Sequence, residues 1–271
     1  MASEKQRNVG LDILKGILAF LVIMGHVLQI RIASGDSTSF MCNIKYFIYS
    51  FHMPLFIALT GYFLEGRIIV CWTFLKKRSI QCLVPICVWG VLITLYDFLV
   101  FDISVAQAAY DFVINDLWYL KSLYIILLLS LPFLVRQKVI WVVPALIIGL
   151  IAGNLYLLAL QLPSFYLGYC IHRFERKHIE IYSRYIIMVI SLIVFCVELF
   201  VVVPDIDASG RLSLQTLPEI CNYLNRLVLS SSAVIFLLCL FRKQTFSQNG
   251  GGKFLLIRGN IHLGYMLYRV C

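Results

Sequence analysis

The chain is organised around long apolar runs that are interrupted by few charged residues. A membrane-spanning helix needs about 20 mainly apolar residues. Eight runs approach or exceed this length, and a weaker ninth follows them: 12–30, 46–64, 80–101, 117–135, 138–153, 155–172, 185–203 and 217–241, then 254–270. Because the runs lack the apolar and polar alternation of membrane barrel strands, we expect helices. The sequence therefore predicts an all-α fold, a polytopic transmembrane helix bundle with about eight or nine spans.

The composition agrees with an integral membrane protein. Hydrophobic residues make up 61% of the chain and charged residues only 14%, which is too little polar surface to cover a soluble globule of this size. No polar stretch is long enough to form a separate soluble domain. Residues 1–271 are therefore predicted to form one integral membrane domain.

The basic residues predict the topology and account for the net charge of +9. Lys and Arg gather at alternate connections, around 5–15, 67–78, 136–138, 173–184 and 242–258, whereas the connections between them are acidic or nearly uncharged. By the positive-inside rule, the N-terminus is cytoplasmic and the chain spans the cell (cytoplasmic) membrane several times. The short spans within 138–172 also allow a re-entrant hairpin.

The first apolar run carries three ionisable residues on one helical face. At 100° per residue, Lys15 and His26 differ by only about 20° around the axis, and Asp12 lies about 40° away. An ionisable group in the hydrocarbon core costs about 2.5–3.5 kcal/mol, so such residues usually face a polar interior or reaction site. His26 could act as a general base, or be satisfied structurally by a neighbouring helix. Asp12 and Lys15 could instead pair with each other at i, i+3 or extend to the membrane surface.

Further polar residues could line a pocket for an acceptor. His52 precedes Pro54 at a depth similar to that of His26, which indicates either a pocket between the two helices or a kinked helix with an interfacial histidine. The other candidates could equally be structural, through an interhelical network or extension to the surface: Lys121, Glu219, Asn222 and Arg226.

A basic cluster of Lys76, Lys77 and Arg78 precedes the third apolar run. The cluster could serve only to keep this connection on the cytoplasmic side of the membrane. It could also contact the phosphate groups of a cytoplasmic ligand, because the Arg guanidinium matches phosphate geometry.

Several other chemistries receive no support from the sequence. It contains no phosphate-binding glycine loop, no H-E-x-x-H, no G-x-S-x-G and no C-x-x-C pair. The histidines have no metal-ligand spacing, so we expect no metal. Because the basic residues are spread among the connections, nucleic-acid binding is not expected either.

Taken together, the motifs resemble the membrane-bound acyltransferase 3 family, especially its fucose 4-O-acetylase-like branch. In the family's opening motif ten residues lie between a basic residue and a histidine, as between Lys15 and His26. The similarity continues in four further segments: FHMPLFIALTGYF (51–63), KKR followed by LVP (76–85), LWYLKSLY (117–124) and LPSFYLGYCIHR (162–173).

This resemblance implies transfer of an acyl group, usually acetyl from cytoplasmic acetyl-coenzyme A, to a hydroxyl of a cell-envelope glycan or related acceptor. The coenzyme would be a donor substrate and not a resident cofactor. His26 would be the catalytic histidine, acting as base or as covalent acyl carrier, with Lys15 and Asp12 on its helix. Arg78 matches the first position of the family's coenzyme-binding R-x-x-R, but Gln81 stands at the second.

The end of the sequence departs from the family pattern. Residues 259–271 resemble the family's penultimate helix, with His262 where a small hydroxyl residue is usual. The resemblance thus implies that the family's last helix is missing. Two alternatives remain open: a transporter or flippase, although no inverted repeat is visible, and a truncated, non-catalytic membrane subunit.

Overall fold

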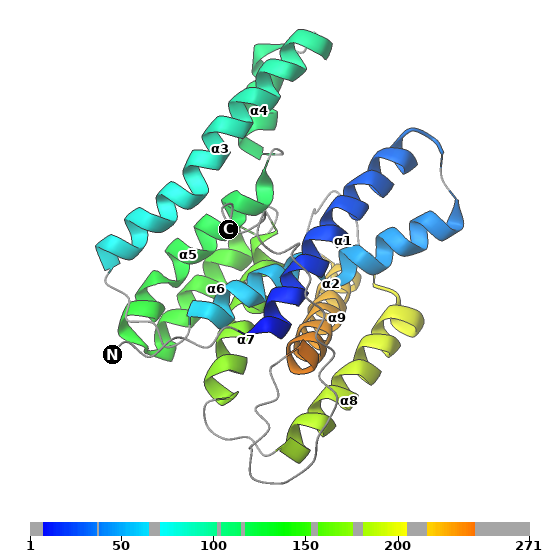
Figure 1. Cartoon of the computed structure of the whole chain (residues 1–271), viewed down its shortest axis with the longest axis vertical. Helices are drawn as coiled ribbons and strands as arrows, with labels where there is room; N and C mark the ends of the chain where they lie inside the picture. Colours follow the sequence, from blue (N-terminus) through cyan, green and yellow to red (C-terminus); the bar gives the residue numbers. More distant parts are fainter. Residues whose placement is uncertain are drawn as a thin grey trace.

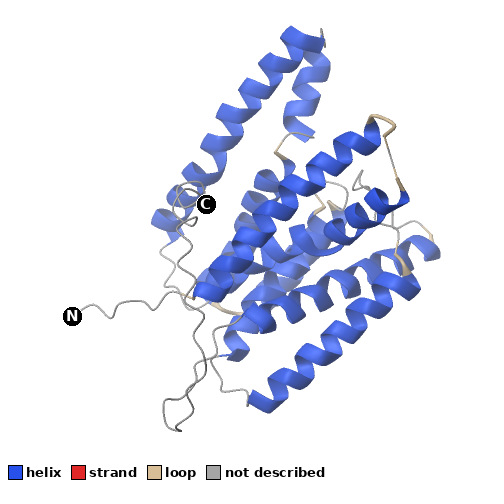
Figure 2. Cartoon of the chain, turned by 45° about the vertical axis from the view of Figure 1, so that its right-hand side comes forward, coloured by secondary structure: helices blue, strands red, loops and turns tan. Residues whose placement is uncertain are grey.

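A computed structural model of the chain describes residues 8–36, 38–64, 71–101, 104–114, 117–152, 157–175, 181–204 and 216–241. In these ranges the structure contains helices and no strands (Figure 2). The helices are α1 (Val9–Ala33), α2 (Ser39–Leu64), α3 (Cys71–Phe101), α4 (Val105–Ile114), α5 (Trp118–Arg136), α6 (Val142–Ile151), α7 (Leu158–Glu175), α8 (Ile181–Val197) and α9 (Leu217–Phe241). A 3-10 turn (Val139–Trp141) precedes α6 and a π-helical turn (Glu198–Val202) follows α8. The predicted all-α fold is confirmed.

Within the described ranges, six helices are long and apolar enough to cross a membrane: Val9–Ala33, Ser39–Leu64, Trp72–Val100, Trp118–Arg136, Arg184–Val202 and Leu217–Phe241. They match six of the predicted spans. The run 138–153 forms a shorter apolar helix, Val139–Ile151, and the run 155–172 forms the 18-residue α7. The weaker ninth run, 254–270, lies outside the described residues. A polytopic helical bundle is thus confirmed, while the number of eight or nine spans stays a prediction.

Helix α2 is the central element of the bundle and packs against α1, α7 and α9 (Figure 1). The α2–α7 crossing is very close, because a Cβ atom on Gly168 would lie 1.9 Å from the carbonyl oxygen of Ala58. A Cβ atom on Gly61 would lie 2.1 Å from the carbonyl oxygen of Phe165. Glycine at both positions therefore lets the two backbones touch.

Two buried apolar clusters meet at α2. One joins α1, α2, α8 and α9 and includes Leu14, Leu55 and Val234. The other joins α2 to α5, α6 and α7 and includes Ile57 and Phe165. Since both sides of α2 are buried, this helix fixes the positions of the polar side chains that it carries.

Helices α3 and α4 pack on each other and extend away from α2, and α3 also packs on α5 (Figure 1). Helix α3 begins at Cys71, well before the predicted span 80–101, because the helix continues through the basic cluster beyond the apolar run. Helix α4 was not predicted, since its 10 residues are too few to span a membrane. Its Phe112 ring closes on Gly90 of α3.

Candidate functional site

His26 lies in the C-terminal half of α1 with an exposed side chain. The preceding residue, Gly25, is buried against α2. A Cβ atom there would lie 3.1 Å from Cε2 of Tyr49 and 3.6 Å from Cγ2 of Ile48. The absence of a side chain at Gly25 therefore brings His26 close to the turn of α2 formed by residues 48–52.

His52 lies on that turn, and only 3% of it is exposed. Its Nδ1 atom is 2.6 Å from the carbonyl oxygen of Ile48. Because a carbonyl only accepts hydrogen bonds, Nδ1 carries the hydrogen and donates it. The imidazoles of His52 and His26 are close enough to interact electrostatically. The structure thus brings these two predicted site residues together.

Tyr49 connects the helices that carry the two histidines. Its ring packs edge-on against that of His52, with 5.0 Å between the ring centroids. Its hydroxyl donates a hydrogen bond to Oε1 of Gln29 on α1, at 2.7 Å. Neither residue was among the sequence-based candidates, because only the packing of α1 on α2 places them beside the histidines.

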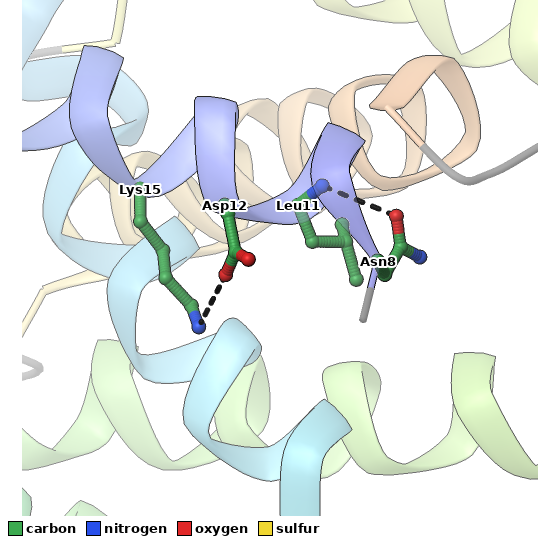
Figure 3. A network of polar contacts seen from close by, with 4 residues as sticks. All are labelled: Asn8, Leu11, Asp12 and Lys15. Carbon is green, nitrogen blue, oxygen red and sulfur yellow. Dashed lines mark hydrogen bonds and ion pairs between the residues drawn. The ribbon is translucent and has the colours of Figure 1, made fainter. Parts of the chain in front are cut away.

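Asp12 and Lys15 lie at the opposite end of α1, where Lys15 Nζ is 3.5 Å from Asp12 Oδ1 (Figure 3). The i, i+3 pairing considered from the sequence is therefore present. The ammonium group also lies 4.0 Å from the centroid of the Phe63 ring on α2. Asn8 caps this end of α1 by accepting a hydrogen bond from the Leu11 amide, at 3.4 Å. The Lys15 side chain is 42% exposed and remains accessible.

His172 of α7 is a polar residue that the sequence did not single out. Its Nδ1 atom lies 2.5 Å from the carbonyl oxygen of Tyr62, and its ring stacks on the Tyr62 ring with centroids 4.4 Å apart. Tyr62 is in the last turn of α2, where carbonyls lack helical partners. His172 thus ties the end of α2 to α7, beside the Phe63 ring that contacts Lys15.

The basic cluster lies in the first turns of α3, with Lys76 and Lys77 exposed and Arg78 partly exposed. Arg78 Nη1 donates a hydrogen bond to Oε1 of Gln81, at 3.1 Å. Gln81, which replaces the second arginine of R-x-x-R, is therefore a hydrogen-bond partner of Arg78, which matches the first. Helix α3 packs mainly on α4 and α5, whereas Lys15 packs against Phe63 of α2.

The structure gives two of the remaining acceptor-pocket candidates local structural partners. Lys121 Nζ donates to the carbonyl oxygen of Phe112 and to that of Val113, the latter at 3.2 Å, near the C-terminus of α4. Glu219 Oε2 accepts a hydrogen bond from the backbone amide of Thr216, at 3.1 Å, as in a capping box. The last two candidates are partly buried on α9: Asn222 and Arg226.

The described residues contain no cluster of three or more His, Cys, Asp or Glu that could hold a metal ion. The structure places the predicted site residues of α1 in two separate groups. One is the histidine pair at the α1–α2 contact, and the other is Lys15 with Asp12 and the Phe63 ring of α2.

Comparison of the sequence with known proteins identifies the family of this chain. The model of the acyltransferase 3 family, an acyltransferase domain, matches residues 8–261. Nodulation protein NolL of Mesorhizobium japonicum is 32% identical over 152 residues, which cover 53% of this chain and 41% of that protein. Nodulation protein NolL of Sinorhizobium fredii is 31% identical over 183 residues, which cover 62% and 50%. The chain thus spans half or less of the length of these curated relatives, and no solved structure matches it. The family match shows that the chain belongs to the acyltransferase 3 family, and its long apolar helices indicate a multi-pass membrane protein.

Proposed function

We propose that the chain is an O-acyltransferase of the cell membrane. It moves an acyl group, acetyl in the simplest case, from cytoplasmic acyl-coenzyme A to a hydroxyl of a cell-envelope glycan or related acceptor. The observation that carries this proposal is the placement of His26 beside buried His52 at one end of α1, with Lys15 accessible at the other. One helix would therefore present a proton acceptor and a cation about 16 Å apart along its axis.

His26 is the general base of the proposed reaction. The imidazole removes the proton of the acceptor hydroxyl as the hydroxyl oxygen attacks the thioester carbonyl carbon. The tetrahedral intermediate then collapses, the carbon–sulfur bond breaks, and the proton returns from His26 to the departing thiolate. The products are an ester and free coenzyme A. In the covalent variant, His26 itself carries the acyl group between donor and acceptor.

Lys15 serves the donor side of the reaction. Lys15 lies eleven positions before His26, which corresponds to a rise of about 16 Å along the helix, roughly half of the hydrocarbon thickness. A donor with its anionic part near Lys15 can therefore extend its thioester arm along α1 toward His26. Lys76, Lys77 and Arg78 supply further positive charge on α3, on the side that the positive-inside rule predicts to be cytoplasmic.

The experiment supplies labelled acetyl-coenzyme A to envelope preparations that contain wild-type protein or the His26→Ala variant at equal levels. We expect label to enter glycan or lipid fractions only with the wild type. Val27→Ala is the matched control, because Val27 is the next residue on α1 and its side chain is 55% exposed.

Equal labelling by wild type and His26→Ala, with both proteins folded and inserted, would contradict the proposal. Movement of an acceptor across the membrane without acyl transfer would favour a transporter. Label trapped on His26 when acceptor is withheld would favour the covalent variant.

A further inference from the structure

One ring nitrogen of His52, Nδ1, forms a hydrogen bond within the protein, whereas Nε2 forms none with the described residues. Its Nδ1 atom donates to the Ile48 carbonyl at 2.6 Å, so in the neutral ring the Nε2 atom is the acceptor. No described residue forms a hydrogen bond with Nε2. Since only 3% of His52 is exposed, Nε2 is an acceptor nitrogen inside the bundle that has no hydrogen-bond partner among the described residues.

The Ile48 bond orients the ring but does not join helices. Ile48 lies four residues before His52 on the same helix, so its carbonyl already accepts the backbone amide hydrogen bond of α2. The edge-on Tyr49 ring restricts the imidazole further. These contacts hold the side chain in one orientation and one tautomer, which is what a binding group requires.

The imidazole of His52 lies near that of His26. The Gly25 contact brings α1 onto the turn that carries His52, and the two imidazoles interact electrostatically. No hydrogen bond joins the two rings, although both side chains lie in the described part of α1 and α2. A molecule placed at His26 therefore meets the second imidazole as well.

We propose that Nε2 of His52 accepts a hydrogen bond from the acceptor substrate and thereby holds the acceptor on His26. This inference rests on the proposed function. A hydroxyl has one hydrogen, and the reacting hydroxyl gives it to His26. The bond to His52 must therefore come from a second donor on the same molecule. The acceptor class is thus a compound with two neighbouring hydroxyl groups, as in a sugar ring, and no proton is transferred to His52.

Two amide substitutions separate the two ring nitrogens of His52. In His52→Asn the side-chain amide takes the place of Nδ1 and can keep the Ile48 bond, but nothing stands at the Nε2 position. In His52→Gln the amide reaches the Nε2 position, where its oxygen can accept, and the Ile48 bond is lost. A purely structural role favours Asn, and an acceptor-binding role favours Gln.

The test measures acetyl transfer at saturating acetyl-coenzyme A while the amount of envelope fraction, the acceptor source, is varied. We expect kcat/KM for the acceptor to fall about 10-fold or more in His52→Asn and about 3-fold or less in His52→Gln. The KM for acetyl-coenzyme A should stay unchanged in both. Thermal unfolding in detergent checks that both variants fold.

Activity retained by His52→Asn and lost by His52→Gln would overturn the inference, as would equal losses in both folded variants. The wild type and His26→Ala are assayed in parallel. If those two do not differ, it is the proposed function that fails, whereas a clear His26 effect with no preference for Gln over Asn at position 52 rejects only the inference.

Discussion

The hydroxyl of Tyr49 on α2 donates a hydrogen bond to Oε1 of Gln29 on α1, across 2.7 Å. The Tyr49 ring also lies against Gly25 of α1, where a Cβ atom would be 3.1 Å from Cε2, and it packs edge-on against the His52 ring. Tyr49 thus contacts both of the helices that carry His26 and His52. Because Tyr49 and Gln29 lie on different helices, a double-mutant cycle can measure the contribution of their hydrogen bond.

Removing this bond should loosen the α1–α2 contact. We expect Tyr49→Phe and Gln29→Leu each to lower the free energy of unfolding by about 0.5–1 kcal/mol, since an exposed hydrogen bond has a small net effect. The double variant should lose less than the sum of both changes. Chemical unfolding in detergent measures the cycle, and strictly additive losses would show that the bond contributes nothing.

The glycine crossing of α2 and α7 should tolerate no added side chain. We expect Gly168→Ala to destabilise the protein by about 3 kcal/mol or more, because the new Cβ would lie 1.9 Å from the Ala58 carbonyl oxygen and the backbones would have to separate. Gly16→Ala is the matched control, because nothing lies within 4 Å of the Cβ position at Gly16. In the control, alanine should raise stability by up to about 1 kcal/mol.

Thermal unfolding of the two glycine variants in the same detergent checks this prediction. Equal stability of Gly168→Ala and Gly16→Ala would contradict the close crossing. A loss confined to Gly168→Ala would instead support direct backbone contact between α2 and α7.

The sequence predicted the parts of the fold that depend on local composition. Apolar run length predicted the helices, since backbone groups in lipid must be satisfied within each segment. Helical periodicity placed Asp12 beside Lys15, and the structure shows their ion pair. The family was also predicted, because a basic residue and a histidine with ten residues between them, here Lys15 and His26, form a local pattern, and the family match confirms it.

Features that depend on packing between distant segments were not predicted. The α2–α7 crossing joins Gly61 to a segment about a hundred residues away, and neither glycine is distinctive alone. Helix α4 was missed because it lies between two spans and is too short to cross a membrane. As a result, the partners that Lys121 finds near the end of α4 could not be predicted either.

Lys121 should stabilise α4. Its ammonium group donates to the carbonyl oxygens of Phe112 and Val113, where the helix dipole also favours a positive charge. We expect Lys121→Met to lower the free energy of unfolding by about 1–2 kcal/mol and to speed proteolysis between α3 and α5. Lys121→Arg should preserve most of the stability. A fall in acceptor-dependent transfer without any loss of stability would instead support the acceptor-pocket role.

Lys15 should affect the donor more than the fold. The Asp12–Lys15 pair is partly exposed, with 42% of the Lys15 side chain accessible, and such pairs contribute about 0–1 kcal/mol. We therefore expect Lys15→Ala to change stability little but to raise the KM for acetyl-coenzyme A about 10-fold, because a cation at the proposed donor site is lost. Lys15→Arg keeps the charge and should restore most donor binding. Steady-state transfer at varied donor concentration, with unfolding measured on the same preparations, separates the two effects. An unchanged KM for acetyl-coenzyme A in Lys15→Ala would show that Lys15 only contacts Asp12 and Phe63. The anionic part of the donor would then bind elsewhere, and the cluster of Lys76, Lys77 and Arg78 would be the next site to test.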